Sequence, residues 1–436
     1  MQKTSAYIKE KIMKNKNLKI MITILLMLGA VMVHAAEIDD NEDAIRFRLK
    51  NDLRRADRPS AGASARDIYG WVQGSMLDVN THYYSDLIGV QAGAYYVYKL
   101  GAKSRWSTRG YLDDHDSFGL VAGAVKFRPA DNMHLKIGRF GTDNGYGSLP
   151  YRIPLIASGS TRTMPTLSEG IIGRYEPSEN IDLWAMYRTR VFLWPDAAVG
   201  VRNEGIYNPG TGHYDTRRAR SFLAGSWHDN TSRYSLGASW QDDVSSQYQA
   251  ILEKKFALAN KDNIKVELLA YHAELNGISR SRSDHDNTQV YSGQITYSLP
   301  KISFFSSAGL VTHTMNNIGS NVDTDIGWPN SLSIDRNKED MISFQFGAQY
   351  FFKPNLSVMV APLITRGYED SRRTIEINGK GVLVAAFYNI TDGPLTGLKI
   401  SIGTDMAKEK RHGSSLGNEL NYWDIKTGIQ YDFMLK

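Results

Sequence analysis

The chain has 436 residues, with 51 Lys and Arg against 46 Asp and Glu and a formal net charge of +5. It contains no cysteine, which excludes disulfides, cysteine-ligated zinc and thiol catalysis. The first 35 residues carry six lysines and one glutamate, so the remainder has 45 basic and 45 acidic residues (51 − 6 and 46 − 1), and the basic charge is no argument for a nucleic-acid partner.

Residues 1–35 have the order of a secretory signal peptide. Lysines come first, an apolar run from Ile20 to Val33 follows, and the small residue Ala35 ends the segment. The apolar run is shorter than the ~20 residues of a membrane-spanning helix. We therefore predict a signal peptide over 1–35 and an exported domain over 36–436, with an N-terminal membrane anchor as the alternative.

Period-two alternation of apolar and polar residues dominates the rest of the chain. Ile45, Phe47 and Leu49 alternate with basic residues, and similar runs recur along the sequence. This alternation predicts strands with one apolar face, and we find no convincing helix. Many runs approach the ~9–11 residues with which a tilted strand crosses a membrane. The eighteen predicted strands are residues 44–54, 68–80, 87–100, 118–128, 132–140, 168–175, 180–191, 217–228, 232–241, 246–257, 263–273, 288–298, 301–313, 341–352, 355–366, 379–388, 397–404 and 420–433.

The connections between the predicted strands alternate in length. Short, turn-rich segments such as 129–131 and 353–355 alternate with long ones such as 101–117, 141–167 and 405–419. Outer-membrane barrels have short periplasmic turns and long extracellular loops, whereas a soluble sandwich has no reason to sort its loops by length. We predict an all-β, 18-stranded antiparallel transmembrane β-barrel in the bacterial outer membrane, in contact with its lipid and lipopolysaccharide.

The last strand has the features of a barrel-assembly signal. Gly428, Tyr431 and Phe433 occupy its glycine and alternate aromatic positions. The pattern resembles the signal read by the barrel-assembly machinery, although the chain continues for three residues beyond Phe433. An ordinary terminal strand with aromatic edges is the alternative.

Three stretches resemble the OprD family of substrate-specific outer-membrane porins, chitoporin-like relatives included. They are Leu155–Pro165 followed by Glu169-Gly170, then Arg372–Glu376, and the Gly-Pro-Leu turn within Asp392–Leu398. Their order and spacing match over nearly the whole predicted barrel. The resemblance implies an 18-stranded barrel with a narrow pore that passes small nutrients by diffusion.

One departure from the family limits what the resemblance implies. Members that take up basic amino acids or carboxylates carry arginines in the strand after Gly-Pro-Leu. Here Lys399, Ser401 and Gly403 stand at those alternate positions. Neither substrate class is therefore carried over to this chain.

Loop 141–167 is the predicted pore constriction. It is long, and its glycines and prolines suit a fixed inward fold, which the family resemblance favours over an outward surface loop. Loop 314–340, with Trp328 and Pro329, is a weaker second candidate. The constriction residues predicted in the first loop are Tyr146, Tyr151, Arg152, Ser158, Ser160 and Arg162.

Basic residues at alternate strand positions are predicted to line the lumen. Charge facing lipid costs about 2–4 kcal/mol at the membrane centre, so these side chains should face inward. They would attract anionic groups of a solute; a charge-balanced wall without selectivity is the alternative. The predicted lumen basic residues are Arg46, Arg48, Lys50, Arg54, Arg188, Arg190, Arg218, Arg220 and Lys399.

Two kinds of motif suggest chemistry that we do not expect. Gly413–Gly417 fits G-x-S-x-G but has no following helix, so a nucleophile elbow is not expected at Ser415. Residues 113–116 and 284–286 combine aspartates with a histidine and are interpreted as solvated acids or lipopolysaccharide-bridging sites rather than metal sites. We predict no catalytic residue, cofactor or metal.

These observations predict a channel for passive, substrate-selective uptake of small hydrophilic nutrients. A 16-stranded general diffusion porin and an outer-membrane barrel hydrolase are the alternatives. The sequence leaves the solute open, and it allows either a monomer or a trimer.

Overall fold

The computed structural model describes residues 42–59, 67–102, 117–142, 151–157, 167–192, 202–203, 207–208, 213–214, 218–258, 262–314, 327–413 and 418–435. The predicted signal peptide lies outside these residues. So do Tyr146, Ser158, Ser160 and Arg162 of the predicted constriction, residues 113–116 and Ser415.

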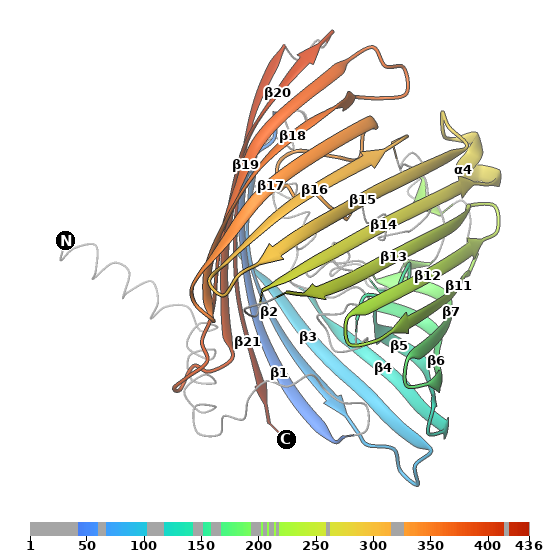
Figure 1. Cartoon of the computed structure of the whole chain (residues 1–436). Coiled ribbons are helices and arrows are strands. Elements are labelled where there is room, and N and C mark those ends of the chain that lie inside the picture. The colour runs from blue at the N-terminus through green and yellow to red at the C-terminus, as the bar shows by residue number, and fades with distance from the viewer. Residues whose placement is uncertain are drawn as a thin grey trace.

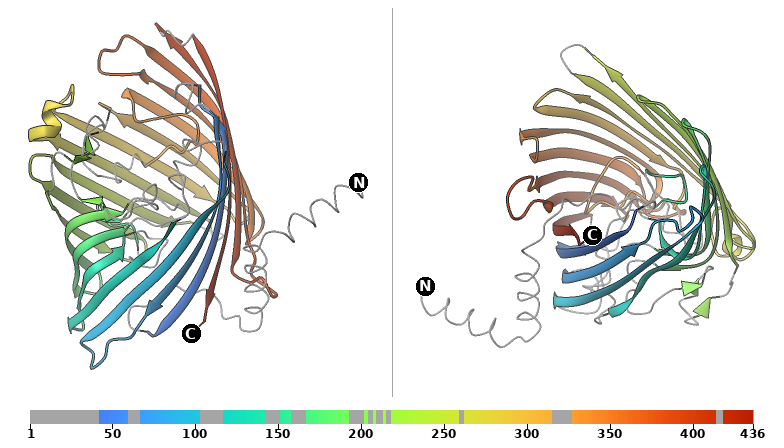
Figure 2. Two further views of the ribbon diagram at one scale, coloured as in Figure 1. Left: turned by 180° about the vertical axis from the view of Figure 1, so that it is seen from behind. Right: turned by 90° about the horizontal axis from the view of Figure 1, so that it is seen from below.

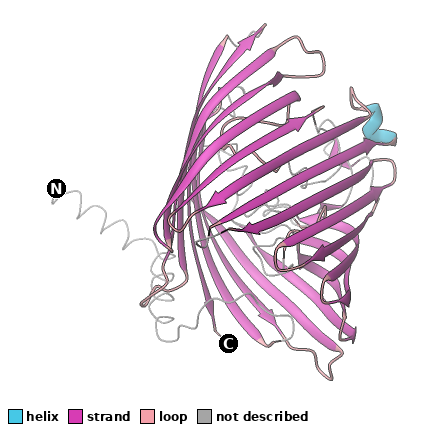
Figure 3. Ribbon diagram, in the orientation of Figure 1, coloured by secondary structure: helices cyan, strands magenta, loops and turns pink. Residues whose placement is uncertain are grey.

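Long strands make up nearly all of the described chain (Figures 1 and 3). The main sheet has 19 strands; β8 is a two-residue addition to β7, so 18 strands form the wall. The wall strands are β1 (Ala44–Asp57), β2 (Asp67–Asn80), β3 (Ile88–Ala102), β4 (Ser117–Ala130), β5 (Met133–Gly141), β6 (Leu167–Ser178), β7 (Ile181–Phe192), β11 (Arg220–His228), β12 (Ser232–Gln241), β13 (Ser245–Ala257), β14 (Asn263–Leu275), β15 (Asn287–Ser298), β16 (Ile302–Val311), β17 (Glu339–Lys353), β18 (Leu356–Tyr368), β19 (Glu376–Asn389), β20 (Leu398–His412) and β21 (Glu419–Met434). The small elements are β8 (Arg202–Asn203), β9 (Tyr207–Asn208), β10 (His213–Tyr214) and the helix α4 (Gly277–Ser281).

The sheet closes because its first and last strands pair. Arg46 lies opposite Met434 and Asp57 opposite Trp423, in antiparallel register. Every other wall strand pairs with its neighbours in the chain, with β7 joined to β11. Figure 2 shows the resulting ring of tilted strands from behind and from below. Closure leaves no unpaired strand edge in the wall, as a membrane barrel requires.

The wall is apolar on its outer face and polar on its inner face, which is the reverse of the arrangement in a soluble protein. On β17, Ile342, Phe344 and Phe346 are 45%, 53% and 57% exposed, whereas Ser343 and Gln345 between them are buried. The same contrast recurs around the barrel, where outward aliphatic and aromatic side chains alternate with inward polar ones. An apolar outer face suits lipid, and a polar inner face suits a water-filled lumen.

The prediction of an 18-stranded antiparallel barrel is confirmed, and each predicted strand overlaps a wall strand. Two details were wrong. β20 extends to His412 rather than ending at 404, which shortens the predicted loop 405–419 to 413–418. A short helix, α4, lies in the connection 276–286, where no helix was expected. Among the described residues, no helix is long and apolar enough to cross a membrane.

The two ends of the barrel differ. At one end, called the turn end below, the connections include 131–132, 179–180 and 354–355. At the other, called the loop end, the connections include 142–166, 276–286 with α4, and 312–338. β21 finishes at the turn end, away from α4 (Figure 1).

Candidate pore constriction

Residues 151–157 of loop 142–166 lie inside the barrel. The backbone N–H of Leu155 donates to Oε1 of Gln249 on the inner face of β13, at 2.9 Å. Ile153, Leu155 and Ile156 are 1%, 2% and 1% exposed and belong to one cluster with inner-wall residues of β5–β7, β11 and β13–β17. Burying an aliphatic side chain stabilises by about 1.5–3 kcal/mol, so these three residues hold the loop against an apolar strip of the lumen.

Tyr151, in the same loop, contacts the wall near the turn end. Its hydroxyl donates to Oδ2 of Asp182 at 2.5 Å, and Asp182 stands at the start of β7. The guanidinium of Arg233 lies 3.8 Å from the centre of the Tyr151 ring. The loop itself leaves β5 at the opposite end, after Gly141. Residues 151–157 therefore lie in the lumen and reach toward the turn end, which agrees with the predicted inward fold of this loop.

Asp182 organises the polar groups around Tyr151. It also accepts from Arg174 at 2.5 Å and lies 3.0 Å from Nε2 of His228. Burial and the hydrogen bond to Asp182 raise the pKa of Tyr151 to about 12. The hydroxyl therefore remains a donor at neutral pH, and the contact does not depend on ionisation in that range.

A second segment, residues 327–338 of the connection 312–338, lies against other strands of the inner wall. Asn330 exchanges two hydrogen bonds with Gln345 of β17, at 3.0 and 2.7 Å. Asp405 of β20 accepts from Ser331 Oγ at 2.7 Å and from the backbone N–H groups of Leu332 at 2.7 Å and Ser333 at 3.1 Å. The segment thus lies against the inner wall from β17 to β20.

The far end of this second segment has both polar and apolar contacts. Arg58, which follows β1, donates to the carbonyl oxygen of Leu332 at 2.8 Å. Ile334 is buried in a cluster with Leu363, Leu420 and Tyr422. The sequence named Trp328 and Pro329 in this loop but missed Asp405, because the predicted strand there ended at 404.

Glycines in the wall admit the two inward segments. A Cβ atom on Gly237 of β12 would lie 2.7 Å from Cβ of Pro154, and one on Gly309 of β16 would lie 2.6 Å from the carbonyl oxygen of Trp328. Contacts this short are not tolerated by a fixed backbone, so a larger residue at either position would displace the segment packed on it.

The basic residues predicted on β1 lie on the inner face and meet carboxylates of neighbouring strands. Arg46 pairs with Asp78 of β2 at 3.1 Å, and Arg48 with Asp432 of β21 at 2.5 Å. Arg54 pairs with Asp424 of β21. Lys50, on the same face, is half-buried.

The predicted basic residues of β7 and β11 have different surroundings. Arg188 and Arg220 lie opposite each other on the inner face and are 1% and 0% exposed, with Arg220 donating to Gln241 at 2.6 Å. Arg218 lies just before β11, is exposed, and pairs with Asp243 at 3.3 Å.

Arg190 departs from the predicted lumen face. The register of β6 and β7 shifts between Glu169 and Gly170, so the alternation of β7 changes phase near Thr189. Arg190 consequently pairs with Glu169 at 3.1 Å, and Glu169 also binds Arg139 at 3.2 Å. This group shares the outward face of the exposed Ile137 and Ile171.

Of the remaining predicted pore residues, Arg152 is half-buried next to Tyr151, and Lys399 of β20 is exposed on the inner face that carries Asp405.

The residues of the predicted assembly signal lie at the seam between β1 and β21. On β21, Tyr431 and Phe433 form an edge-to-face pair with ring centres 4.6 Å apart, and Phe433 stacks on Phe47 across the seam at 5.4 Å. Gly428 lies opposite Asp52 in that seam.

A closed barrel with a lipid-suited outer face, a polar lumen and two inward loop segments defines a channel-forming outer-membrane protein. Residues 38–422 match the family model described as outer membrane porin, OprD family. The membrane-associated protein UidC of Escherichia coli (strain K12) is 56% identical over 408 residues, which is 94% of this chain and 96% of that protein. The chain therefore belongs to the OprD family of outer membrane porins.

Solved structures show the same fold at low sequence identity. OccAB1 of Acinetobacter baumannii superposes with a TM-score of 0.74 at 13% identity, covering 92% of this chain and 99% of that one. OpdK of Pseudomonas aeruginosa, in a crystal structure with vanillate, has a TM-score of 0.72 at 16% identity, covering 90% and 98%. OccK9 (OpdG) of Pseudomonas aeruginosa also has a TM-score of 0.72, at 15% identity and the same coverage.

The family and the fold together identify an outer-membrane channel for substrate-specific uptake rather than an enzyme. The 18-stranded wall argues against the 16-stranded alternative, and family membership argues against the hydrolase. In the outer membrane the loop end faces outward and the turn end faces the periplasm.

Proposed function

We propose that the channel passes small hydrophilic solutes passively and favours those with an anionic group. The observation that carries this proposal is a cationic patch on the inner faces of β20, β21 and β1, which lie side by side (Figure 1). The patch consists of Lys50, Lys399 and Lys426 with Asp52 between them.

Cross-strand register brings these residues together. Lys50 and Lys399 both lie opposite Gln430, so they share one row across three strands. Adjacent strands are ~4.8 Å apart, which puts the two lysine backbones about 10 Å from each other. Two rows further along, Lys426 lies opposite Arg54, and Asp52 stands in the row between.

The patch is richer in basic than in acidic residues. It contains three lysines and one aspartate, and the neighbouring Arg54 pairs with Asp424. Lys399 is exposed, and Lys50 and Lys426 are half-buried, so these ammonium groups are within reach of lumen water. Excess positive charge in a narrow, low-dielectric passage attracts anions and repels cations.

The reversal potential of the purified protein in a planar bilayer under a KCl gradient tests this proposal. We expect the wild type to favour chloride over potassium. Combined Lys50→Gln, Lys399→Gln and Lys426→Gln substitutions should shift the reversal potential toward zero. Lys408→Gln is the matched control, because Lys408 lies on the outward face of β20 and pairs with Glu419 at 2.5 Å. A cation-selective wild type, or an unchanged potential in the triple variant, would contradict the proposal.

The proposal extends to the route by which the barrel reaches the membrane. Residues 1–35 would direct export, and the last strand, with Gly428, Tyr431 and Phe433, would be read by the barrel-assembly machinery. Phe433→Ala should lower the amount of folded barrel in isolated outer membranes, whereas Phe352→Ala, an exposed aromatic on β17, should not.

One chain supplies all 18 strands of the wall, so a monomer is sufficient for passage. A trimer would place three such channels in parallel. Native mass spectrometry of the detergent-solubilised protein distinguishes these two states.

A further inference from the structure

Three side chains of the kinds that bind metals meet at the loop end, beside the roots of the inward connection 312–338. His313 follows β16, where this connection leaves the wall, and Glu339 is the first residue of β17, where it returns. His285 comes from the connection 276–286 between β14 and β15. Their ligand atoms all lie within 4.8 Å of one another.

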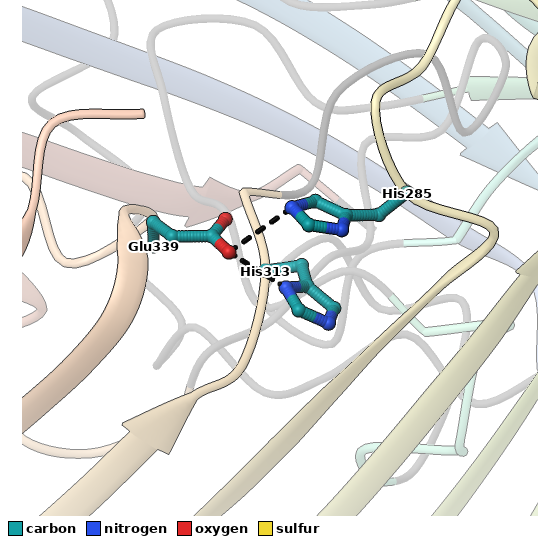
Figure 4. Close-up of side chains that lie close together, drawn as sticks. All are labelled: His285, His313 and Glu339. Carbon is teal, nitrogen blue, oxygen red and sulfur yellow. Dashed lines mark hydrogen bonds and ion pairs between the residues drawn. The ribbon is translucent and has the colours of Figure 1, made fainter. Parts of the chain in front are cut away.

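Both imidazoles are directed at one carboxylate oxygen (Figure 4). Nδ1 of His313 is 2.8 Å from Oε1 of Glu339, and Nε2 of His285 is 3.0 Å from the same atom. Nε2 of His285 is buried, yet it forms no well-aligned hydrogen bond with any residue that the structure describes. A buried ring nitrogen beside a carboxylate oxygen, without a hydrogen bond, is suited to metal coordination.

The two rings also stack, with centres 3.7 Å apart and an interplanar angle of 16°. The stacking holds the two rings side by side, and their ligand nitrogens lie within 4.8 Å of each other. A neutral imidazole offers a nitrogen lone pair, which is the form that binds metals.

Glu339 requires positive charge near it, because its side chain is fully buried. Nη2 of Arg373 is 3.8 Å from Oε1 of Glu339, but it lies closer, at 2.7 Å, to Asp340. The N–H of Thr314 donates to the other carboxylate oxygen at 3.4 Å. A cation held between Glu339 and the two histidines would compensate the buried carboxylate directly.

We propose that His285, His313 and Glu339 bind a Zn²⁺ ion. Two imidazoles and one carboxylate are ligands for Zn²⁺, whereas Mg²⁺ and Ca²⁺ prefer oxygen ligands throughout. Tetrahedral bonds of ~2.0 Å set ligand atoms about 3.3 Å apart, so the two N···O distances need to widen by only a few tenths of an ångström. The fourth position is left for water.

The sequence pattern at 284–286 contains one of these ligands but not the others. Asp286 pairs with Arg280 at 2.5 Å, and Asp284 accepts from Ser371. The two aspartates are thus engaged elsewhere. The other two proposed ligands, His313 and Glu339, lie 28 and 54 residues after His285 (313 − 285 and 339 − 285), so the local pattern could not reveal them.

A bound ion would cross-link two connections at the loop end of the channel. It would join the connection 276–286 to both roots of the connection 312–338, which carries the inward segment 327–338. An ion that binds only this arrangement stabilises it in proportion to the logarithm of its concentration. Zn²⁺ would thus hold the inward segment in place from outside the cell.

Equilibrium dialysis of the folded barrel against Zn²⁺, followed by elemental analysis, tests the proposal. We expect about one Zn²⁺ per chain, lost in His285→Ala and in His313→Ala and retained in excess Mg²⁺. His82→Ala is the matched control, because His82 also lies 2.9 Å from a carboxylate, that of Asp43 at the turn end, but has no second histidine partner in its ion pair.

Thermal unfolding supplies a second measurement that keeps the test decisive. Zn²⁺ should raise the melting temperature of the wild type and of His82→Ala but not that of His285→Ala, whose substitution lies in a surface connection and leaves the wall intact. Equal Zn²⁺ content in wild type and His285→Ala, or the same stabilisation of both, would overturn the proposal.

Discussion

The two inward segments are held in the lumen by different interactions. Segment 151–157 is held mainly by three buried aliphatic side chains, together with hydrogen bonds from Leu155 to Gln249 and from Tyr151 to Asp182. Segment 327–338 is held mainly by polar contacts, and Asp405 alone accepts three of them. The first segment depends on the shape of the wall, and the second depends on a few charged and amide groups. Substitutions that disturb shape or charge should therefore act on one segment and spare the other.

The largest effect is expected for Asp405→Ala. It removes the acceptor of three hydrogen bonds to segment 327–338, which should cost roughly 3 kcal/mol or more of loop docking. The segment should leave the wall, and single-channel conductance in a planar bilayer should rise. Glu419→Gln, an exposed carboxylate on the outward side, is the control and should conduct as the wild type does. Unchanged conductance in Asp405→Ala would show that this segment does not narrow the pore.

Gly237→Val tests the shape-dependent segment. Its Cβ would lie 2.7 Å from Cβ of Pro154, and overpacking of this kind costs about 1–3 kcal/mol. We expect segment 151–157 to shift, conductance to change and the melting temperature to fall. Gly403→Ala is the control, because a Cβ there meets Leu332 only at 3.6 Å, an ordinary contact. If the two variants have the same conductance and melting temperature, the close approach at Gly237 does not determine the position of segment 151–157.

Tyr151→Phe should have a smaller effect. It deletes one hydrogen bond to Asp182, which keeps Arg174 and His228, so the loss should be about 1 kcal/mol. The pKa of Tyr151, raised to about 12 from about 10 in the unfolded chain, means that the folded state favours the protonated hydroxyl. This contribution to stability is therefore complete below pH 10 and is lost as the pH rises toward 12. Melting curves should show a constant difference between wild type and variant from pH 6 to 9; a difference that varies within that range would contradict this assignment.

The smallest effect is expected for Arg152→Ala. Arg152 is half-buried beside Tyr151, so its charge contributes to the field in the lumen without a large role in packing. The preference for chloride should fall, but less than in the triple lysine variant, with little change in melting temperature. A shift larger than that of the triple variant would place the main anion site at the loop rather than at the cationic patch.

Much of the wall was predictable because a membrane barrel repeats one simple pattern. Lipid requires apolar residues at every second position, and runs such as Ile342, Phe344 and Phe346 show this directly. The pattern fails near the loop end of β20. There Lys408 and Lys410 face outward and Glu409 and Arg411 face inward, so both faces are polar and the strand has no apolar period.

The lumen was less predictable, because its contacts join residues far apart in sequence. The inward position of residues 151–157 could be predicted from the length and composition of their loop together with the family resemblance, but the partners of Tyr151 and Leu155 could not. A one-residue irregularity near Thr189 reversed the direction of Arg190, and nothing in the local sequence indicates it. Lys50 and Lys399 were predicted to line the lumen, but Lys426 and the proximity of the three lysines were not. They come from three strands whose register is set only when the barrel closes.

The seam between β1 and β21 also constrains the order in which the molecule folds. Arg48 pairs with Asp432, 384 residues later, so the two sides of the seam are synthesised almost a whole chain apart. Contacts of such large sequence separation form slowly, because the intervening chain must be ordered first. Until that last pairing, β1 presents an open hydrogen-bonding edge that could join a foreign strand. The growing barrel must therefore be kept from premature partners until its final strand arrives.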